Sequence, residues 1–212
     1  MILHALAVGP LDVNCYLVAC PRSRAALVID PGGDEEEIWH LLTAEKLQLR
    51  AVANTHGHFD HVGGNAGLIR KSGADLLIHR NDCKLLEAMC SQGAMFGCRL
   101  EASPPPSRFL EDGAILAIGD LPISVIHTPG HSPGGVSFLV AGHLFSGDTL
   151  FAGSVGRTDL PGGDFAVLMA SIRERLLTLP DETIVHPGHG PGTTIGREKA
   201  HNPFLAKAGG PL

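Results

Sequence analysis

The run His56-x-His58-x-Asp60-His61 constrains the fold of this chain more than any other part of the sequence. In an extended segment, side chains two residues apart point to the same face, so His56 and His58 can bind one ion. Asp60 and His61 follow where the chain turns into a helix. Four such groups cannot all reach one ion, but they can supply two neighbouring ions. Imidazole with carboxylate favours Zn, with Fe and Mn as alternatives. We therefore predict a site for two divalent metal ions.

Three further candidate ligands lie in glycine-rich turns that follow apolar residues: His131, Asp148 and His189. Glycine lets the backbone approach an ion closely, and loops on a rigid scaffold commonly carry ligands. Among the 12 histidines we predict structural or surface roles for His4, His40, His79, His143 and His201. His127 and His186 are strand-end residues, with hydrogen bonding to a ligand as the alternative.

Strand and helix patterns occur in a similar order in the two halves of the chain. Apolar runs between turn residues predict strands at 3–8, 15–19, 25–29, 51–54, 75–79, 115–118, 123–127, 136–140, 143–146 and 183–186. Helices are predicted at 34–46, 62–71, 81–89, 164–179 and 193–200, with Asp34, Asn81 and Asp164 as N-caps. We predict a loop at 91–106. This order favours an α/β fold with helices outside two sheets, a four-layer αβ/βα sandwich.

The ordered set His56, His58, Asp60, His61, His131, Asp148 and His189 resembles that of the metallo-β-lactamase superfamily. The resemblance spans nearly the whole chain and implies a two-metal site at one edge of the sandwich. It implies that one ion takes His56, His58 and His131 and that the other takes Asp60, His61 and His189. It further implies that Asp148 bridges the two ions together with a hydroxide.

Within that superfamily the chain looks most like the short form of the glyoxalase II-like (hydroxyacylglutathione hydrolase) family. The motifs that carry this likeness are Asp12-x-Asn14-Cys15-Tyr16-Leu17, Asp30-Pro31-Gly32, Ser146-Gly147-Asp148-Thr149-Leu150-Phe151, Gly156-Arg157-Thr158-Asp159, Pro187-Gly188-His189-Gly190-Pro191 and Thr194-Ile195-Gly196-x-Glu198-Lys199-x-x-Asn202-Pro203. The long form adds a C-terminal helical domain that grips glutathione. A chain of 212 residues has no room for that domain, so we expect a single domain over 1–212.

This likeness implies hydrolysis of a thioester, of the S-2-hydroxyacylglutathione (S-lactoylglutathione-like) type. Two cations about 3.5–4 Å apart can share an oxygen, and metal binding lowers the pKa of water to about 7. The hydroxide attacks the carbonyl carbon, and the thiolate leaves readily because free thiols have a pKa near 8.5. Asp60 is the predicted catalytic residue, as a ligand and as an orienter or proton acceptor for the hydroxide.

The main alternative is a persulfide dioxygenase with one iron held by His56, His131 and Asp148, because such enzymes resemble this chain in fold. Diiron electron-transfer relatives place Glu at the position of His58 and carry a flavin domain, so that function is disfavoured. Nucleic-acid-processing relatives have large insertions and basic surfaces, which this sequence does not show, so that function is disfavoured too. β-Lactam hydrolysis is disfavoured because exported β-lactamases usually lack Asp at the position of Asp60.

Net charge and composition restrict the kinds of partner that this chain is expected to bind. The net charge of −6 and the absence of long basic runs predict neither nucleic-acid nor membrane partners. The small-molecule thioester is the partner that the family resemblance implies. No stretch approaches the roughly 20 apolar residues of a membrane span, and Met1–Pro10 does not resemble a signal peptide. We therefore expect a cytoplasmic protein, with five free cysteines. Met95 and Phe96 could cover the site, and Arg157 could contact a substrate anion or pair with Asp159 or Asp164.

Overall fold

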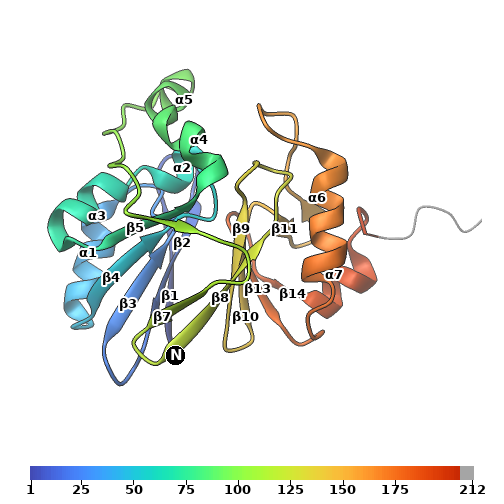
Figure 1. Cartoon of the computed structure of the whole chain (residues 1–212), viewed down its shortest axis with the longest axis horizontal. Helices are drawn as coiled ribbons and strands as arrows, with labels where there is room; N and C mark the ends of the chain where they lie inside the picture. The colour runs from blue at the N-terminus through green and yellow to red at the C-terminus, as the bar shows by residue number, and fades with distance from the viewer. Residues whose placement is uncertain (206–212) are drawn as a thin grey trace, which may run out of the picture.

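Two six-stranded sheets face each other in the computed structural model, which describes residues 1–205 (Figure 1). Residues 206–212, the end of the predicted domain, lie outside the described part. The first sheet has the order β1-β2-β3-β4-β5-β6, and its first three strands are antiparallel while the rest are parallel. Its strands are β1 (Ile2–Val8), β2 (Val13–Ala19), β3 (Ala25–Ile29), β4 (Gln48–Ala53), β5 (Asp75–His79) and β6 (Arg108–Leu110).

The second sheet has the order β14-β13-β10-β9-β8-β7. Strands β7 to β10 form an antiparallel meander. β10 then pairs in parallel with β13, and β13 pairs antiparallel with the short β14. Its strands are β7 (Ile115–Ile118), β8 (Leu121–His127), β9 (Val136–Val140), β10 (His143–Gly147), β13 (Ile184–Pro187) and β14 (Thr193–Thr194). A separate hairpin joins β11 (Leu150–Phe151) to β12 (Ser154–Val155).

Helices cover the outer faces of both sheets (Figure 1). On the first half, α1 (Glu35–Ala44) and α3 (Asn65–Ser72) cover the outer face of the sheet, while α2 (Phe59–Val62), the 3₁₀ turn η1 (Arg80–Asp82), α4 (Cys83–Glu87) and α5 (Met89–Met95) lie at its upper edge in this view. On the second half the helices are α6 (Phe165–Ser171), its π-helical continuation η2 (Ile172–Leu176) and α7 (Ile195–His201). This arrangement confirms the predicted four-layer α/β sandwich.

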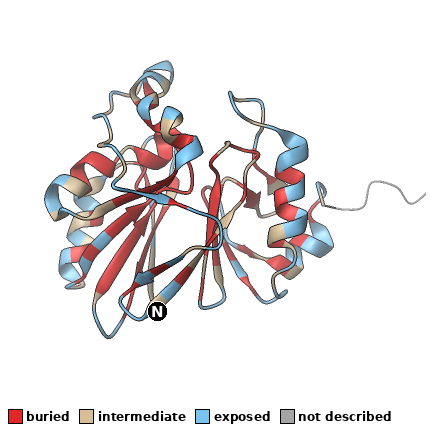
Figure 2. Cartoon of the chain, viewed as in Figure 1, coloured by how far each residue is buried: buried red, intermediate tan, exposed pale blue. Residues whose placement is uncertain are grey.

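The alternation of side chains along β3 shows how the layers are filled. Leu27 and Ile29 face the second sheet and pack in one cluster with Phe138. Val28 points the other way and packs in the cluster that contains Ile38 of α1. Full burial of one such side chain stabilises the fold by about 1.5–3 kcal/mol. Strands with apolar residues on both faces therefore fit only between layers, and Figure 2 shows them buried.

Three local predictions need correction. Asn81 does not cap a helix, because η1 intervenes and the Asn81 backbone N–H donates to Nδ1 of His79. The carboxylate of Asp34, at the N-cap of α1, accepts from the N–H of Gly9 instead of from its own helix. The predicted loop 91–106 begins inside α5, which continues to Met95. Asp164 does cap α6, accepting from the N–H of Val167.

Gly63 and Gly64 split the predicted helix 62–71 into α2 and α3. A Cβ at Gly63 would lie 2.4 Å from the carbonyl oxygen of Gly32, which only a glycine avoids. Four strands of two or three residues, β6, β11, β12 and β14, were not predicted. Within residues 1–205, no helix combines the length and apolar character that crossing a membrane requires.

Candidate metal centre

The seven predicted ligands lie after strand ends that meet at one edge of the sandwich. His56 follows β4, His58 precedes α2, and α2 itself contains Asp60 and His61. His131 follows β8, Asp148 directly follows β10, and His189 follows β13. The six residues other than Asp148 form two groups whose ligand atoms lie within 4.8 Å of one another: His56, His58 and His131, and Asp60, His61 and His189. Their membership matches the two sets that the family resemblance implies, and a third, overlapping group at the same spacing joins Asp30, His56 and His61.

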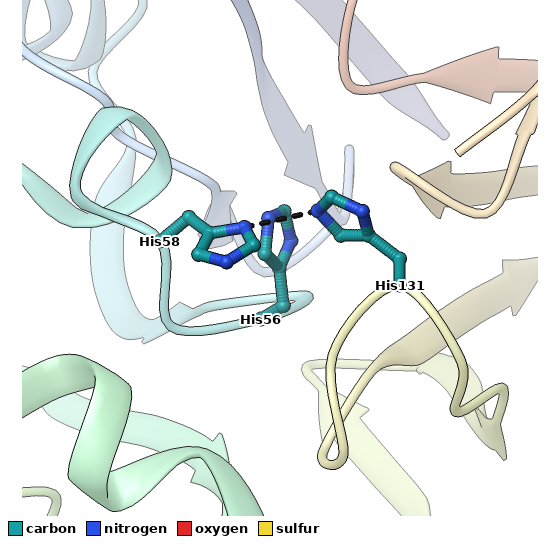
Figure 3. Close-up of side chains that lie close together, drawn as sticks. All are labelled: His56, His58 and His131. Atoms are coloured by element: carbon teal, nitrogen blue, oxygen red, sulfur yellow. Dashed lines mark hydrogen bonds between the residues drawn. The ribbon is translucent and has the colours of Figure 1, made fainter. Parts of the chain in front are cut away.

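The first group joins the two halves of the molecule (Figure 3). His56 and His58 come from the segment between β4 and α2, and His131 comes from the loop after β8. The Nδ1 atom of His58 lies 2.9 Å from Nε2 of His131, and the three side chains are almost fully buried. Three imidazole rings that converge in a buried place form an arrangement typical of a site for a transition-metal ion.

Asp148 lies between the two groups. Its Oδ1 is 3.4 Å from Nε2 of His61, and its Oδ2 is 3.7 Å from Nε2 of His131 and 3.8 Å from Nε2 of His189. Asp60, by contrast, contacts the histidines of its own group, with Oδ2 at 3.3 Å from Nε2 of His189 and 3.7 Å from Nε2 of His61. One carboxylate therefore faces ligand atoms of both groups, as a bridging ligand must.

Hydrogen bonds behind the rings fix which nitrogen faces the site. Thr55 donates its hydroxyl proton to Oδ2 of Asp30, so its Oγ1 accepts from Nδ1 of His56, 3.0 Å away. Oδ2 of Asp30 also accepts from Nδ1 of His61 at 3.0 Å. In the neutral rings, Nε2 of both histidines therefore keeps its lone pair for the site.

His131 is held in the same way from the other half of the chain. Its Nδ1 lies 2.7 Å from the backbone carbonyl oxygen of Arg157, which can only accept. The proton is therefore on Nδ1, and Nε2 carries the lone pair that points toward His58. These partners select the tautomer that a metal ligand needs.

Three buried atoms in this cluster have no hydrogen-bond partner: Nε2 of His56, Nε2 of His61 and Oδ1 of Asp148. Leaving one buried polar group unpaired costs about 1–3 kcal/mol, so three together need an explanation. Bound divalent cations would satisfy all three, because each atom can act as an acceptor that faces the centre. The residues present therefore fit a divalent-metal site.

Burial and neighbouring charges shift the titration of the cluster. Burial, reinforced by His131, lowers the pKa of His58 to about 4. Burial raises the pKa of Asp60, but His61 and His189 outweigh it, and the pKa of this carboxyl is lowered. For His61 burial opposes protonation, yet Asp148, Asp60 and Asp30 raise its pKa overall. At His61 a cation therefore competes with a proton for the same negative surroundings.

Asp82 is a buried carboxylate that the sequence did not reveal as part of the site. It accepts from the N–H of Gly57 at 2.9 Å, from Oγ of Ser132 at 2.7 Å and from the N–H of Gly134 at 2.5 Å. Gly57 lies between His56 and His58, and Ser132 follows His131, so Asp82 ties both loops of the first group together. The only sequence signal was an acidic residue three positions after the end of β5, in the turn η1.

The loop of His189 is attached to β2. Nδ2 of Asn14 donates to the carbonyl oxygens of Pro187 and Gly190, and the hydroxyl of Tyr16 donates to that of Pro187. A Cβ on Gly188 would lie 2.2 Å from Oδ1 of Asp148, so only glycine lets this loop approach the bridging carboxylate. These contacts explain the roles of two motifs noted in the sequence, Asp12-x-Asn14-Cys15-Tyr16-Leu17 and Pro187-Gly188-His189-Gly190-Pro191.

A pocket of about 590 Å³ opens beside the cluster. Candidate ligands form its polar end, namely His58, Asp60, His131, Asp148 and His189. The rest of its lining is mostly apolar: Leu11, Phe59, Leu85, Ala88, Gln92, Met95, Phe96, Phe151, Arg157, Leu160 and Pro161. A pocket of this size and character suits a small organic molecule whose reacting group reaches the cluster.

Arg157 lines this pocket, but its guanidinium forms two hydrogen bonds of 2.7 Å with Asp159. Of its two predicted roles, the ion pair with Asp159 is therefore the one observed. Four of the other histidines contact one another in two pairs. His127 stacks on His79 with ring centroids 4.3 Å apart. Nε2 of His186 lies 2.8 Å from Nδ1 of His143, and the His186 ring stacks on Phe145.

A model of the metallo-β-lactamase superfamily matches residues 8–189 of the chain. The chain belongs to this superfamily. Among curated proteins, hydroxyacylglutathione hydrolase GloC from Haemophilus influenzae is 38% identical over 209 residues, covering 97% of this chain and 98% of the relative. The superfamily match, together with this relative and the clustered His and Asp side chains, identifies the chain as a metallo-hydrolase.

Solved structures of the superfamily agree with the fold. The B3 metallo-β-lactamase BLEG-1 has a TM-score of 0.91 at 40% identity, covering 97% of this chain and 100% of that one. TTHA1623 in a di-iron-bound form has a TM-score of 0.89 at 44% identity, covering 95% and 100%. ETHE1 from Myxococcus xanthus has a TM-score of 0.81 at 29% identity, covering 98% and 86%.

Proposed function

We propose that this chain is a thioesterase with two divalent metal ions, of the S-2-hydroxyacylglutathione hydrolase type. The observation that carries the proposal is the pair of His/Asp groups that share Asp148, with three unpaired acceptor atoms aimed at the centre. The likeness to hydroxyacylglutathione hydrolase GloC supports the choice of a thioester as substrate. The nitrogen and oxygen ligands favour Zn²⁺, with Fe and Mn as alternatives.

In this proposal one cation is held by His56, His58 and His131, and the other by Asp60, His61 and His189. Asp148 faces both. When bound, the cations supply a water of lowered pKa and a Lewis acid for the substrate carbonyl. The hydrogen bonds to the ring nitrogens that face away from the site keep the other imidazole lone pairs directed inward. They thereby fix the positions of the ligand side chains relative to one another.

Asp60 is the proposed catalytic residue. Its carboxylate is nearly buried, has a lowered pKa and faces His189, so it remains an acceptor at neutral pH. From this place it can orient the attacking water and accept its proton. Water adds to the carbonyl carbon, the carbon–sulfur bond breaks, and the products are a carboxylic acid and a thiol. The thiol needs little acid assistance to leave, since free thiols have a pKa near 8.5.

The test uses purified protein with its metal content measured, together with a panel of thioesters that includes S-lactoylglutathione. We expect two metals per chain and release of free thiol, detected with a thiol-reactive dye. The same protein after chelation should release none, and restoring the metal should restore activity. A metal-replete protein that cleaves no member of the panel would falsify the proposal.

The likeness to ETHE1 favours persulfide dioxygenation as the second candidate. There His56, His131 and Asp148 would hold a single iron. Oxygen uptake with glutathione persulfide, measured beside the metal content, separates the two reactions. Two metals per chain without oxygen uptake would exclude the dioxygenase. A β-lactam belongs in the same panel because of the likeness to BLEG-1.

A further inference from the structure

The pocket beside the candidate metal centre has an apolar wall built from the first half of the chain. Phe59 of α2, Leu85 and Ala88 at α4, and Met95 and Phe96 at the end of α5 form it. These five side chains, which we call the apolar wall, lie next to His58 and Asp60 in the same pocket. A group that reaches the candidate metal centre along this wall therefore meets carbon rather than hydrogen-bonding groups.

Gln92, a polar residue that lines the pocket beside the apolar wall, does not change this character. Its Nε2 donates to the carbonyl oxygen of Leu85 at 2.9 Å, and its Oε1 accepts from the N–H of Phe59 at 3.3 Å. Both ends of the amide are thus engaged with backbone atoms of the wall itself. Gln92 stiffens the apolar wall instead of offering a contact to a polar substrate.

The wall ends in two large apolar side chains at the surface. Met95 is 85% exposed and Phe96 is 59% exposed, and Phe96 stacks on Phe59 with ring centroids 5.1 Å apart. A contiguous exposed apolar patch beside a cavity marks a binding surface. Because the patch continues into the pocket, its natural occupant is the part of the substrate that extends from the reacting carbonyl.

The pocket offers little to the charged groups of glutathione, which carries two carboxylates and an ammonium. Arg157 is the one Lys or Arg among the described residues that line the pocket. Its guanidinium already holds both oxygens of Asp159. A carboxylate of the carrier would have to compete with this pair.

We propose that the enzyme selects its thioester through a bulky apolar acyl group lying against the apolar wall, and that the glutathione carrier contributes little to selection. This inference rests on the proposed thioesterase function and deepens it. A lactoyl group, with three carbons, fills only a small part of a pocket of about 590 Å³. A longer or aromatic acyl group removes more apolar surface from water on both sides of the contact.

The experiment compares acetyl, butanoyl, hexanoyl and octanoyl thioesters of N-acetylcysteamine, a small neutral thiol, using the metal-replete protein. We expect kcat/KM to rise about fourfold per methylene until the wall is covered. For each acyl group, kcat/KM of the glutathione thioester should differ from that of the N-acetylcysteamine thioester by less than about fivefold, since exposed charged groups contribute little.

The double variant Met95→Ser/Phe96→Ser tests the wall itself. Both side chains are exposed, so the fold should persist. We expect kcat/KM for the octanoyl thioester to fall about tenfold, with little change for the acetyl thioester. The matched control is Ile115→Ser on β7, which is 65% exposed and does not line the pocket; it should change neither value.

Two outcomes overturn the inference while the thioesterase function stands: equal kcat/KM for short and long acyl groups, or a strong preference for glutathione at every length. Absence of any thiol release overturns the proposed function instead. In that case calorimetry with octanoate and acetate still tests the wall, because octanoate should bind the metal-replete protein more tightly. Equal affinities of the two acids would overturn the inference.

Discussion

The carboxylate of Asp82 lies 2.7 Å from the hydroxyl of Ser132, although fifty positions separate the two residues in the chain. The same carboxylate accepts the backbone N–H of Gly57 and of Gly134. All three partners donate, so this fully buried carboxyl functions as an anion. Burial raises its pKa, and the hydrogen bonds from Ser132, Gly134 and Gly57 act against that rise.

Substitution of Asp82 by Asn should weaken metal binding without touching a ligand. The amide brings an NH₂ group into a place surrounded by donors, and the loops of His56, His58 and His131 lose their common anchor. We expect metal affinity to fall about 10- to 100-fold, measured by competition with a chelator of known affinity. The control is Asp112→Asn, which alters an exposed pair with Arg175. Equal affinities in wild type and Asp82→Asn would show that the loops hold their shape unaided.

Removal of the metals should destabilise the fold. Nε2 of His56, Nε2 of His61 and Oδ1 of Asp148 are buried without hydrogen bonds, and cations bound there stabilise only the folded state. With metal well above its dissociation constant, we expect the melting temperature to exceed that of the chelated protein by roughly 10 °C. Differential scanning calorimetry at several metal concentrations measures this. A melting temperature independent of metal would contradict the proposed sites.

Replacement of Asp60 by Ala should empty the second site selectively. Asp60 contacts His61 and His189, whereas His56, His58 and His131 keep their partners. We expect the metal content to fall from two ions per chain to one and kcat to fall by about two to three orders of magnitude. Elemental analysis and thiol release measure these, with the exposed Asp120→Ala as control. Activity within a fewfold of wild type would refute the two-ion assignment.

His186 should contribute to the pH dependence of stability. Burial, with His143 nearby, lowers its pKa in the folded protein from 6.5 to about 4. The unfolded chain therefore binds this proton more readily, so the contribution is complete above about pH 6.5 and is lost as the pH falls toward 4. In the metal-free protein, His186→Phe should flatten the fall in melting temperature over this range. His40→Phe, at an exposed position, should leave the slope unchanged.

Much of the candidate centre could be predicted because the relevant patterns are local. The spacing of His56 and His58 placed both near one edge, and glycine-rich turns after apolar strands indicated His131, Asp148 and His189. The order of apolar strand runs and helical patterns along the chain likewise indicated helices outside two sheets. Where the local signal was ambiguous, the prediction failed. Asn81 has the chemistry of a cap, but η1 occupies its place.

The sequence by itself determined the kinds of candidate ligand, their order along the chain and the layered α/β fold, since these depend on residue chemistry and on periodicity between near neighbours. Only the tertiary structure decided which groups hydrogen-bond to the candidate ligands or their loops, and which side chains line the pocket beside them. Asp30, Asp82 and the carbonyl of Arg157 orient histidines or their loops, and α4 and α5 form the apolar wall. These contacts join segments far apart in sequence, so they arise from the packing of two sheets and leave no periodic signal in the chain.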